Sequence, residues 1–81
     1  MAGKTKRVYV LNIRKDEQNF PEVHTTFEGA VAAVLDDISE HEVEGEKYDY
    51  DAIRHEVETY AFYFDGTTDT EYDICDCPLV K

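Results

Sequence analysis

The alternation of apolar and polar residues predicts strands near both ends of the chain. Residues 7–14 are rich in β-branched and aromatic side chains, with apolar groups on both faces, which is typical of a central strand. Asp69–Ile74 alternates strictly between acids and the less polar Thr, Tyr and Ile, which predicts a strand with one buried face and one wholly acidic face. Pro78 is expected to end that last strand.

Two further segments complete the predicted strands. Lys15–Pro21 is expected to be a polar turn, followed by a short strand at Glu22–Thr25. Tyr60–Phe64 fits either the end of a helix or a strand that turns at Asp65-Gly66 into the last strand. We prefer the strand, because aromatic runs suit strands and Asp-Gly is a good turn former.

A helix is predicted from residue 27, where apolar residues recur at helical spacing and Thr25–Glu28 matches a capping box. Its buried stripe should comprise Phe27, Ala30, Val31, Val34, Leu35 and Ile38. Gly45 and the acids around it are expected to end this helix. A second helix should begin near Tyr50 with Asp49 as its cap, and its inward residues should be Ile53, Val57 and Tyr60.

These elements predict an α+β fold: a small antiparallel sheet of three to four strands with one or two helices packed on one face. Residues 7–14 should be central in the sheet, with the C-terminal hairpin beside them. At 81 residues we expect a single domain over residues 1–81, with a flexible basic start at residues 1–6. Its core must be thin.

The charge distribution is strongly uneven. The chain has 19 acids and 8 basic residues, for a net charge of −11. Between Glu22 and Asp76, 17 carboxylates face only Lys47 and Arg54, whereas residues 1–15 hold five cations and no acid. A folded surface cannot hide so many carboxylates, so we expect a dense negative field that repels nucleic acid and anionic membranes and attracts basic partners. The N-terminal cations are expected to pair internally with acids.

Many of the carboxylates fall on alternate residues, with spacings of about 7 Å on a strand or 6 Å between successive helical turns. Three interpretations stay open: mimicry of a nucleic acid, a soluble interaction or dimerisation module whose acids serve only solubility, and adaptation to high salt. Under mimicry, Tyr48 and Tyr50 would anchor arginines of the partner. The carboxylates expected to bind the partner are Asp36, Glu40, Glu42, Glu44, Glu46, Asp49, Asp51, Asp69, Glu71 and Asp73.

Motifs for catalysis or for cofactor binding are missing from the sequence. It has no Gly-rich phosphate loop, no Gly-x-Ser-x-Gly and no His-Glu-x-x-His, so we expect neither an enzyme nor a cofactor. Cys75 and Cys77 have the wrong spacing for a zinc knuckle, and we expect free thiols and no metal. Val8–Ile13 is too short for a signal-peptide core and no stretch approaches transmembrane length, which favours a cytoplasmic protein.

In size, acidity and strand–helix–hairpin order, the chain resembles the small phage-encoded inhibitors of host defence nucleases, notably anti-CRISPR proteins and other DNA mimics. Those families share no motif, so the resemblance is one of style over the whole chain and transfers no residue. It implies a stoichiometric inhibitor in the host cytoplasm that docks on the Arg- and Lys-lined DNA- or PAM-reading surface of a CRISPR effector or another nuclease. The basic start, Lys4–Arg7, departs from a pure mimic.

Overall fold

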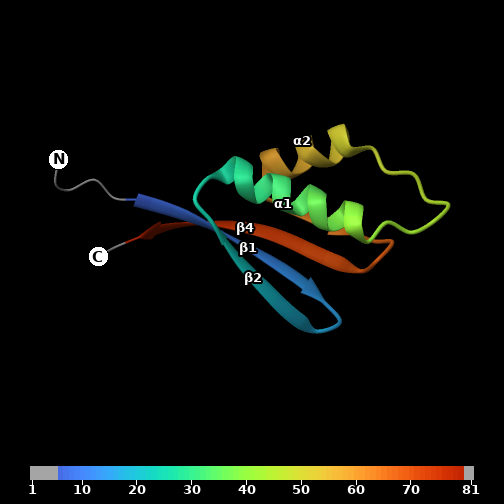
Figure 1. Cartoon of the computed structure of the whole chain (residues 1–81), viewed down its shortest axis with the longest axis horizontal. Helices are drawn as coiled ribbons and strands as arrows, with labels where there is room; N and C mark the ends of the chain where they lie inside the picture. The colour runs from blue at the N-terminus through green and yellow to red at the C-terminus, as the bar shows by residue number, and fades with distance from the viewer. Residues whose placement is uncertain (1–5, 80–81) are drawn as a thin grey trace.

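A computed structural model describes residues 6–79 of the chain. Within that range, four antiparallel strands form one sheet in the order β2-β1-β4-β3, and two helices lie on one face of it (Figure 1). The elements are β1 (Lys6–Lys15), β2 (Gln18–His24), α1 (Phe27–Glu40), α2 (Tyr50–Tyr60), β3 (Phe62–Asp65) and β4 (Thr70–Leu79). The predicted α+β fold is confirmed, with residues 7–14 inside the sheet and the C-terminal hairpin beside them.

The expected flexible start covers residues 1–6. Residues 1–5 lie outside the described residues, and Lys6 already belongs to β1, where it pairs with Leu79 of β4. Neither helix within residues 6–79 is both long enough and apolar enough to cross a membrane.

A single apolar layer between the sheet and the helices forms the core. The sheet contributes four side chains to this layer, and the stripes of the two helices contribute the rest. Burial of each aliphatic or aromatic side chain contributes about 1.5–3 kcal/mol relative to exposure, so this thin layer supplies most of the driving force for folding. The buried hydrophobic residues are Leu11, Ile13, Ala30, Val31, Val34, Ile38, Ile53, Val57, Tyr72 and Ile74.

The predicted stripe of α1 is confirmed at its centre, while Phe27 and Leu35 are only half-buried. The cap of α1 is Thr26, whose hydroxyl accepts a hydrogen bond from the Gly29 N–H at 2.9 Å. The predicted capping box is therefore wrong in its reciprocal part, because Glu28 stands one position too early to bond back to the cap. Asp49 caps α2 as predicted, accepting from the Ala52 N–H at 3.2 Å.

The connection between β1 and β2 is much shorter than predicted. The strands continue to Lys15 and resume at Gln18, so only Asp16 and Glu17 form the turn, with φ angles of 54° and 63°. Positive φ at both positions is the geometry of the turn that matches the twist of a two-residue hairpin. Asp-Glu lacks the Asn or Gly typical of this turn, so the hairpin carries no local signal and the predicted second strand, Glu22–Thr25, starts four residues too late.

The aromatic segment is a strand, as preferred, and turns after Asp65 into β4. Tyr60 is not inward: it is the last residue of α2 and 71% exposed. Ala61 follows with a φ of 54°, which stops the helix and re-aims the chain. Pro78 does not end β4, because the strand runs to Leu79 alongside the start of β1.

The turn at Glu17 provides a test of the backbone argument. Glu17→Gly should raise the free energy of unfolding by about 0.5–1 kcal/mol, because a side chain at positive φ is strained and glycine is not. Urea denaturation measures the change. Glu17→Gln is the matched control, since it removes the same charge and keeps the strain. Equal effects of the two substitutions would contradict the prediction.

Candidate interaction surface

The sheet divides the predicted binding residues between two surfaces. Tyr72 and Ile74 lie in the core under the helices, so Glu71 and Asp73, which alternate with them along β4, lie on the sheet face away from the helices. We call this uncovered side the open face. The remaining acids lie on the helices and their connection, except Asp69, which sits in the turn before β4. The predicted residues therefore do not form one continuous surface.

Cations from β1 neutralise much of the charge on β4. Arg14 Nη1 lies 2.5 Å from Asp73 Oδ2 and 3.6 Å from Glu71 Oε1, and Asn12 donates to Asp73 Oδ1 at 3.1 Å. Arg7 Nη1 lies 2.7 Å from Asp76 Oδ1. The hydrogen bond and charge of Asp73 raise the pKa of Arg14. Glu71 and Asp73 lie on one face as predicted, but Arg14 lies beside them and Cys75 and Cys77 follow, so the prediction of a wholly acidic face is wrong.

A second group of acids has no such neutralisation. Within residues 6–79, none of its side chains lies at ion-pair distance from a lysine or arginine, and all are exposed. The group begins on the second half of α1, follows the connection between the helices and ends in the first turn of α2. In Figure 1 this connection reaches further to the right than any strand. We call it the acidic loop patch, comprising Asp36, Glu40, Glu42, Glu44, Glu46, Asp49 and Asp51.

Several of these charges are unfavourable for the fold. Glu40 is the last residue of α1, where the helix dipole is negative and no basic residue lies in the final turn. An acid at that end costs roughly 0.3–1 kcal/mol. Asp49 and Asp51 are different, because they lie at the start of α2, where the dipole favours them. The C-terminal half of the acidic loop patch is thus compatible with the helix, whereas Glu40 opposes it.

The two tyrosines predicted as anchors hold the connection together. Tyr48 accepts a hydrogen bond from the Val43 N–H at 3.1 Å, and Tyr50 donates to Glu42. Their rings stack with centroids 6.0 Å apart. Desolvation, helped by Glu42, raises the pKa of Tyr50 to about 12. Both rings are half-buried, so their main role in this structure is to order the loop that carries the acids.

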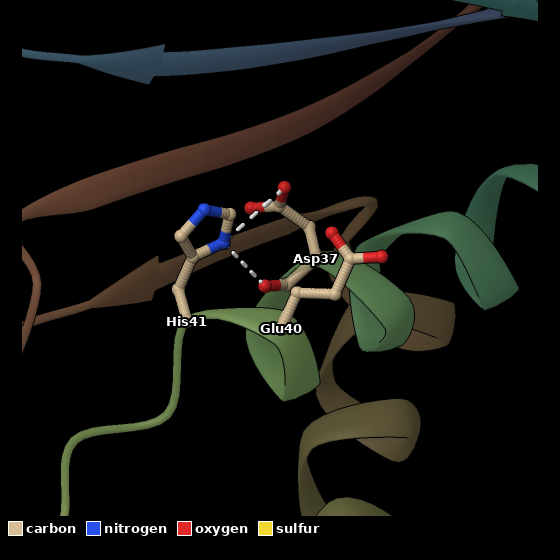
Figure 2. A group of neighbouring side chains, drawn as sticks. All are labelled: Asp37, Glu40 and His41. Carbon is tan, nitrogen blue, oxygen red and sulfur yellow. Dashed lines mark hydrogen bonds and ion pairs between the residues drawn. The ribbon is translucent and has the colours of Figure 1, made fainter.

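A neighbouring cluster, Asp37, Glu40 and His41, brings possible metal-ligand atoms within 4.8 Å of one another. Figure 2 shows the His41 ring directed at Asp37: its Nδ1 lies 2.8 Å from the Asp37 carbonyl oxygen and 3.6 Å from Oδ1. Tyr72 donates to the other oxygen, Oδ2, at 2.6 Å. These bonds tie His41 and Asp37 together at the end of α1 and join Asp37 to β4.

Asp37 was not among the predicted residues, although its carboxylate joins α1 to the centre of the sheet. It also borders a hollow of about 180 Å³ beside β2, where Glu22, Asp36, Asp37 and Glu40 supply the polar lining. The sequence signal for this contact was the position of Asp37 directly before Ile38, a residue of the buried stripe. The partner of Asp37, Tyr72, is 35 positions away, beyond the reach of local patterns.

The cysteines lie on the open face. Cys75 and Cys77 are free, as predicted, and pair with Val10 and Val8 of β1. Burial raises the pKa of Cys77, with the Cys75 thiol next in importance, so its thiol form is favoured at neutral pH. Together with Val23, 67% exposed on β2, they make this end of the open face apolar.

Comparison with protein-family models, curated proteins and solved structures gave no significant match to this chain. Its function is therefore inferred from the geometry and charge of these surfaces.

Tyr72 links the core to Asp37, and its loss should be measurable. Tyr72→Phe should lower the free energy of unfolding at pH 7 by about 1–3 kcal/mol, because the partly buried carboxylate loses its donor. Urea denaturation measures this. Tyr60→Phe is the matched control, since Tyr60 is largely exposed.

The same pair of variants should differ in alkali. Burial, then the Asp37 hydrogen bond, raises the pKa of Tyr72, so the folded protein keeps a proton that the unfolded chain loses above pH 10. This stabilisation is complete below pH 10 and is lost as the pH rises further. The decline in stability above pH 10 should be shallower in Tyr72→Phe than in wild type or Tyr60→Phe. Parallel declines would contradict the assignment.

Proposed function

We propose that this protein is a small acidic inhibitor that binds the basic nucleic-acid-binding surface of a defence nuclease, such as a CRISPR effector, as a DNA mimic. It carries out no catalysis in this role. The observation that supports the proposal is the acidic loop patch, where seven exposed acids have no lysine or arginine partner within the described part of the chain.

The contrast between the two acidic surfaces favours a role in binding. Where β1 supplies arginines, the acids of β4 form ion pairs with them, as expected of charges that stabilise the fold. In the acidic loop patch the acids repel one another, and Glu40 also opposes the dipole of α1. Charges that do not stabilise their own protein are best explained by a cationic partner or by solubility.

Carboxylates are good substitutes for phosphates in a basic groove. A guanidinium presents a planar fork of donors that binds either group through two parallel hydrogen bonds. The long-range field of the patch would speed the encounter, and the bonds of Tyr48 and Tyr50 keep the connection ordered before binding, which lowers the entropy lost on docking.

A second candidate function is an interaction or dimerisation module that uses the open face, with the acids serving only solubility. The apolar end of that face and the exposed rings of Phe62 and Phe64 favour it. The two functions differ in their response to salt, because screening weakens charge pairing and leaves apolar contacts largely unaffected.

The inhibitor proposal predicts that the protein slows DNA cleavage by at least one of a panel of purified CRISPR effector nucleases, at stoichiometric amounts and in competition with duplex DNA. Removing four charges from the patch should weaken inhibition about tenfold or more, because close charge pairs at interfaces are each worth over 1 kcal/mol. Raising the salt concentration should weaken the wild-type protein in the same way. The patch variant is Glu40→Gln, Glu42→Gln, Glu44→Gln and Glu46→Gln.

A matched control removes the same amount of charge elsewhere and should inhibit nearly as well as wild type. It comprises Asp16→Asn, Glu17→Gln, Glu28→Gln and Glu58→Gln. Equal inhibition by the patch variant and the control would show that only net charge matters. Inhibition that persists in the patch variant at high salt would instead favour the open face.

A further inference from the structure

The two edge strands of the sheet are protected differently. The Ile74 N–H donates to the Ala61 carbonyl, so even-numbered residues of β4 direct their backbone groups toward β3. The odd-numbered residues of β4 therefore bond to the even-numbered residues of β1, and the odd-numbered residues of β1 bond to the even-numbered residues of β2. The odd-numbered residues of β2 are left with their backbone groups directed toward the free outer edge. Pro21 is one of them. It removes an N–H from the edge of β2, which is a common protection against strand pairing.

Pro78 has the same effect on β4. This strand extends beyond β3, whose last pair is Phe62 with Asp73, and the backbone of Pro78 faces the uncovered side. Because proline has no backbone N–H, no free donor is left at this position. Both prolines thus stand at positions where a backbone N–H would otherwise point to solvent.

The edge of β3 has no such protection. Its outward backbone groups belong to Phe62 and Phe64, because Tyr63 and Asp65 are oriented toward β4. Within residues 6–79, neither Phe backbone has a hydrogen-bond partner on that side. The two rings lie on the open face, and the residues Phe62 and Phe64 are 41% and 46% exposed. An exposed aromatic edge without proline or lysine favours addition of another strand.

The charge beside this edge indicates what kind of strand would fit. Phe62 and Phe64 pair with Asp73 and Glu71 of β4, so each ring lies next to a carboxylate. Asp73 already has both oxygens engaged, by Arg14 and Asn12. Glu71 is less constrained: its side chain is 46% exposed, and its Oε1 lies 3.6 Å from Arg14 Nη1.

A hollow of about 550 Å³ lies beside Phe64 and Glu71, between the two hairpin turns. Four carboxylates and two cations line it, so it is negative on balance. A long cationic side chain from an added strand could cross the Phe64 ring and enter this hollow, gaining a cation–π contact and an ion pair. A second copy of the chain, with its own net charge of −11, would bring like charges together instead.

We propose that β3 binds an extended basic segment of a partner protein by strand addition. The backbone of Phe62 and Phe64 forms hydrogen bonds with the added strand. An arginine or lysine of that strand stacks on Phe64 and pairs with Glu71. This site shares no residue with the acidic loop patch and does not depend on the proposed inhibition.

The test uses a short blocked peptide of alternating arginine and valine as the probe, with binding followed by NMR titration. The amides of Phe62 and Phe64 should shift and become protected from hydrogen exchange. Phe64→Pro should weaken binding about tenfold or more, because it removes an outward N–H as Pro21 and Pro78 do. Tyr63 precedes it in strand conformation, which proline tolerates. Phe64→Val, which keeps the N–H, should weaken binding less.

A second measurement does not depend on the folding of a variant. A peptide of the same sequence, with its backbone amides methylated, cannot form the strand ladder and should not bind the wild-type protein. Failure of the unmethylated peptide to bind, or equal binding of both peptides, would overturn the proposal. Equal binding to Phe64→Pro and to wild type would do so as well.

Two further outcomes would show either that the β3 edge pairs with a second copy of the chain or that the peptide binds at another site. If sedimentation shows a wild-type dimer that Phe64→Pro converts to a monomer, the edge belongs to a second copy and the proposal fails. If the variant lacking the charges of Glu40, Glu42, Glu44 and Glu46 loses the peptide, the peptide binds the acidic loop patch and the proposal fails. Retention there, with loss in Phe64→Pro, supports β3 whatever the outcome of the cleavage assays.

Discussion

The packing of Leu11, Ile13, Tyr72 and Ile74 against the two helices is the interaction on which the other features depend. Because the helices cover one face only, every strand must present alternate residues to water. The core layer is thin and the net charge is −11, so folding has little stability to spare against self-repulsion. Screening by salt should relieve part of that repulsion without changing the fold.

One-sided burial also explains why the acids belong to two populations. Neighbouring strands bring Arg14 to Asp73 on the open face and Arg7 to Asp76 on the opposite face, so pairing is a consequence of the register. The connection between α1 and α2 pairs with no strand of the described chain, and its only cation is Lys47. Its acids are left to solvent or to a partner. The strand register that pairs the acids of β4 with arginines gives the acidic loop patch no basic partner within the described residues.

Much of the fold could be predicted because its signals are local. The alternation in β4, the helical stripe around Val31 and Val34, and the cap at Asp49 each depend on residues a few positions apart. Errors arose where one backbone angle decided the outcome. Positive φ at Asp16 and Glu17 makes a tight turn without its usual residues, and positive φ at Ala61 ends α2 directly after Tyr60, which stays exposed.

The candidate site was predictable in its exposure and unpredictable in its arrangement. Desolvation keeps carboxylates such as Glu42, Glu44 and Glu46 at the surface in any fold. Their separation from Glu71 and Asp73 depends on which face of the sheet the helices cover. The contacts of Asp37 with Tyr72, and of Arg14 with Asp73, join residues 35 and 59 positions apart and are set by tertiary packing alone.

The pairing of Lys6 with Leu79 has a practical consequence. The described chain enters and leaves the sheet side by side, at one end of a body 53 Å long, and the helix connection lies at the opposite end (Figure 1). A tether attached at the end where β1 begins and β4 ends would therefore leave the helix connection, which carries the acidic loop patch, pointing away from the support. Both tethering directions should present that patch equally well on a biosensor chip or a bead.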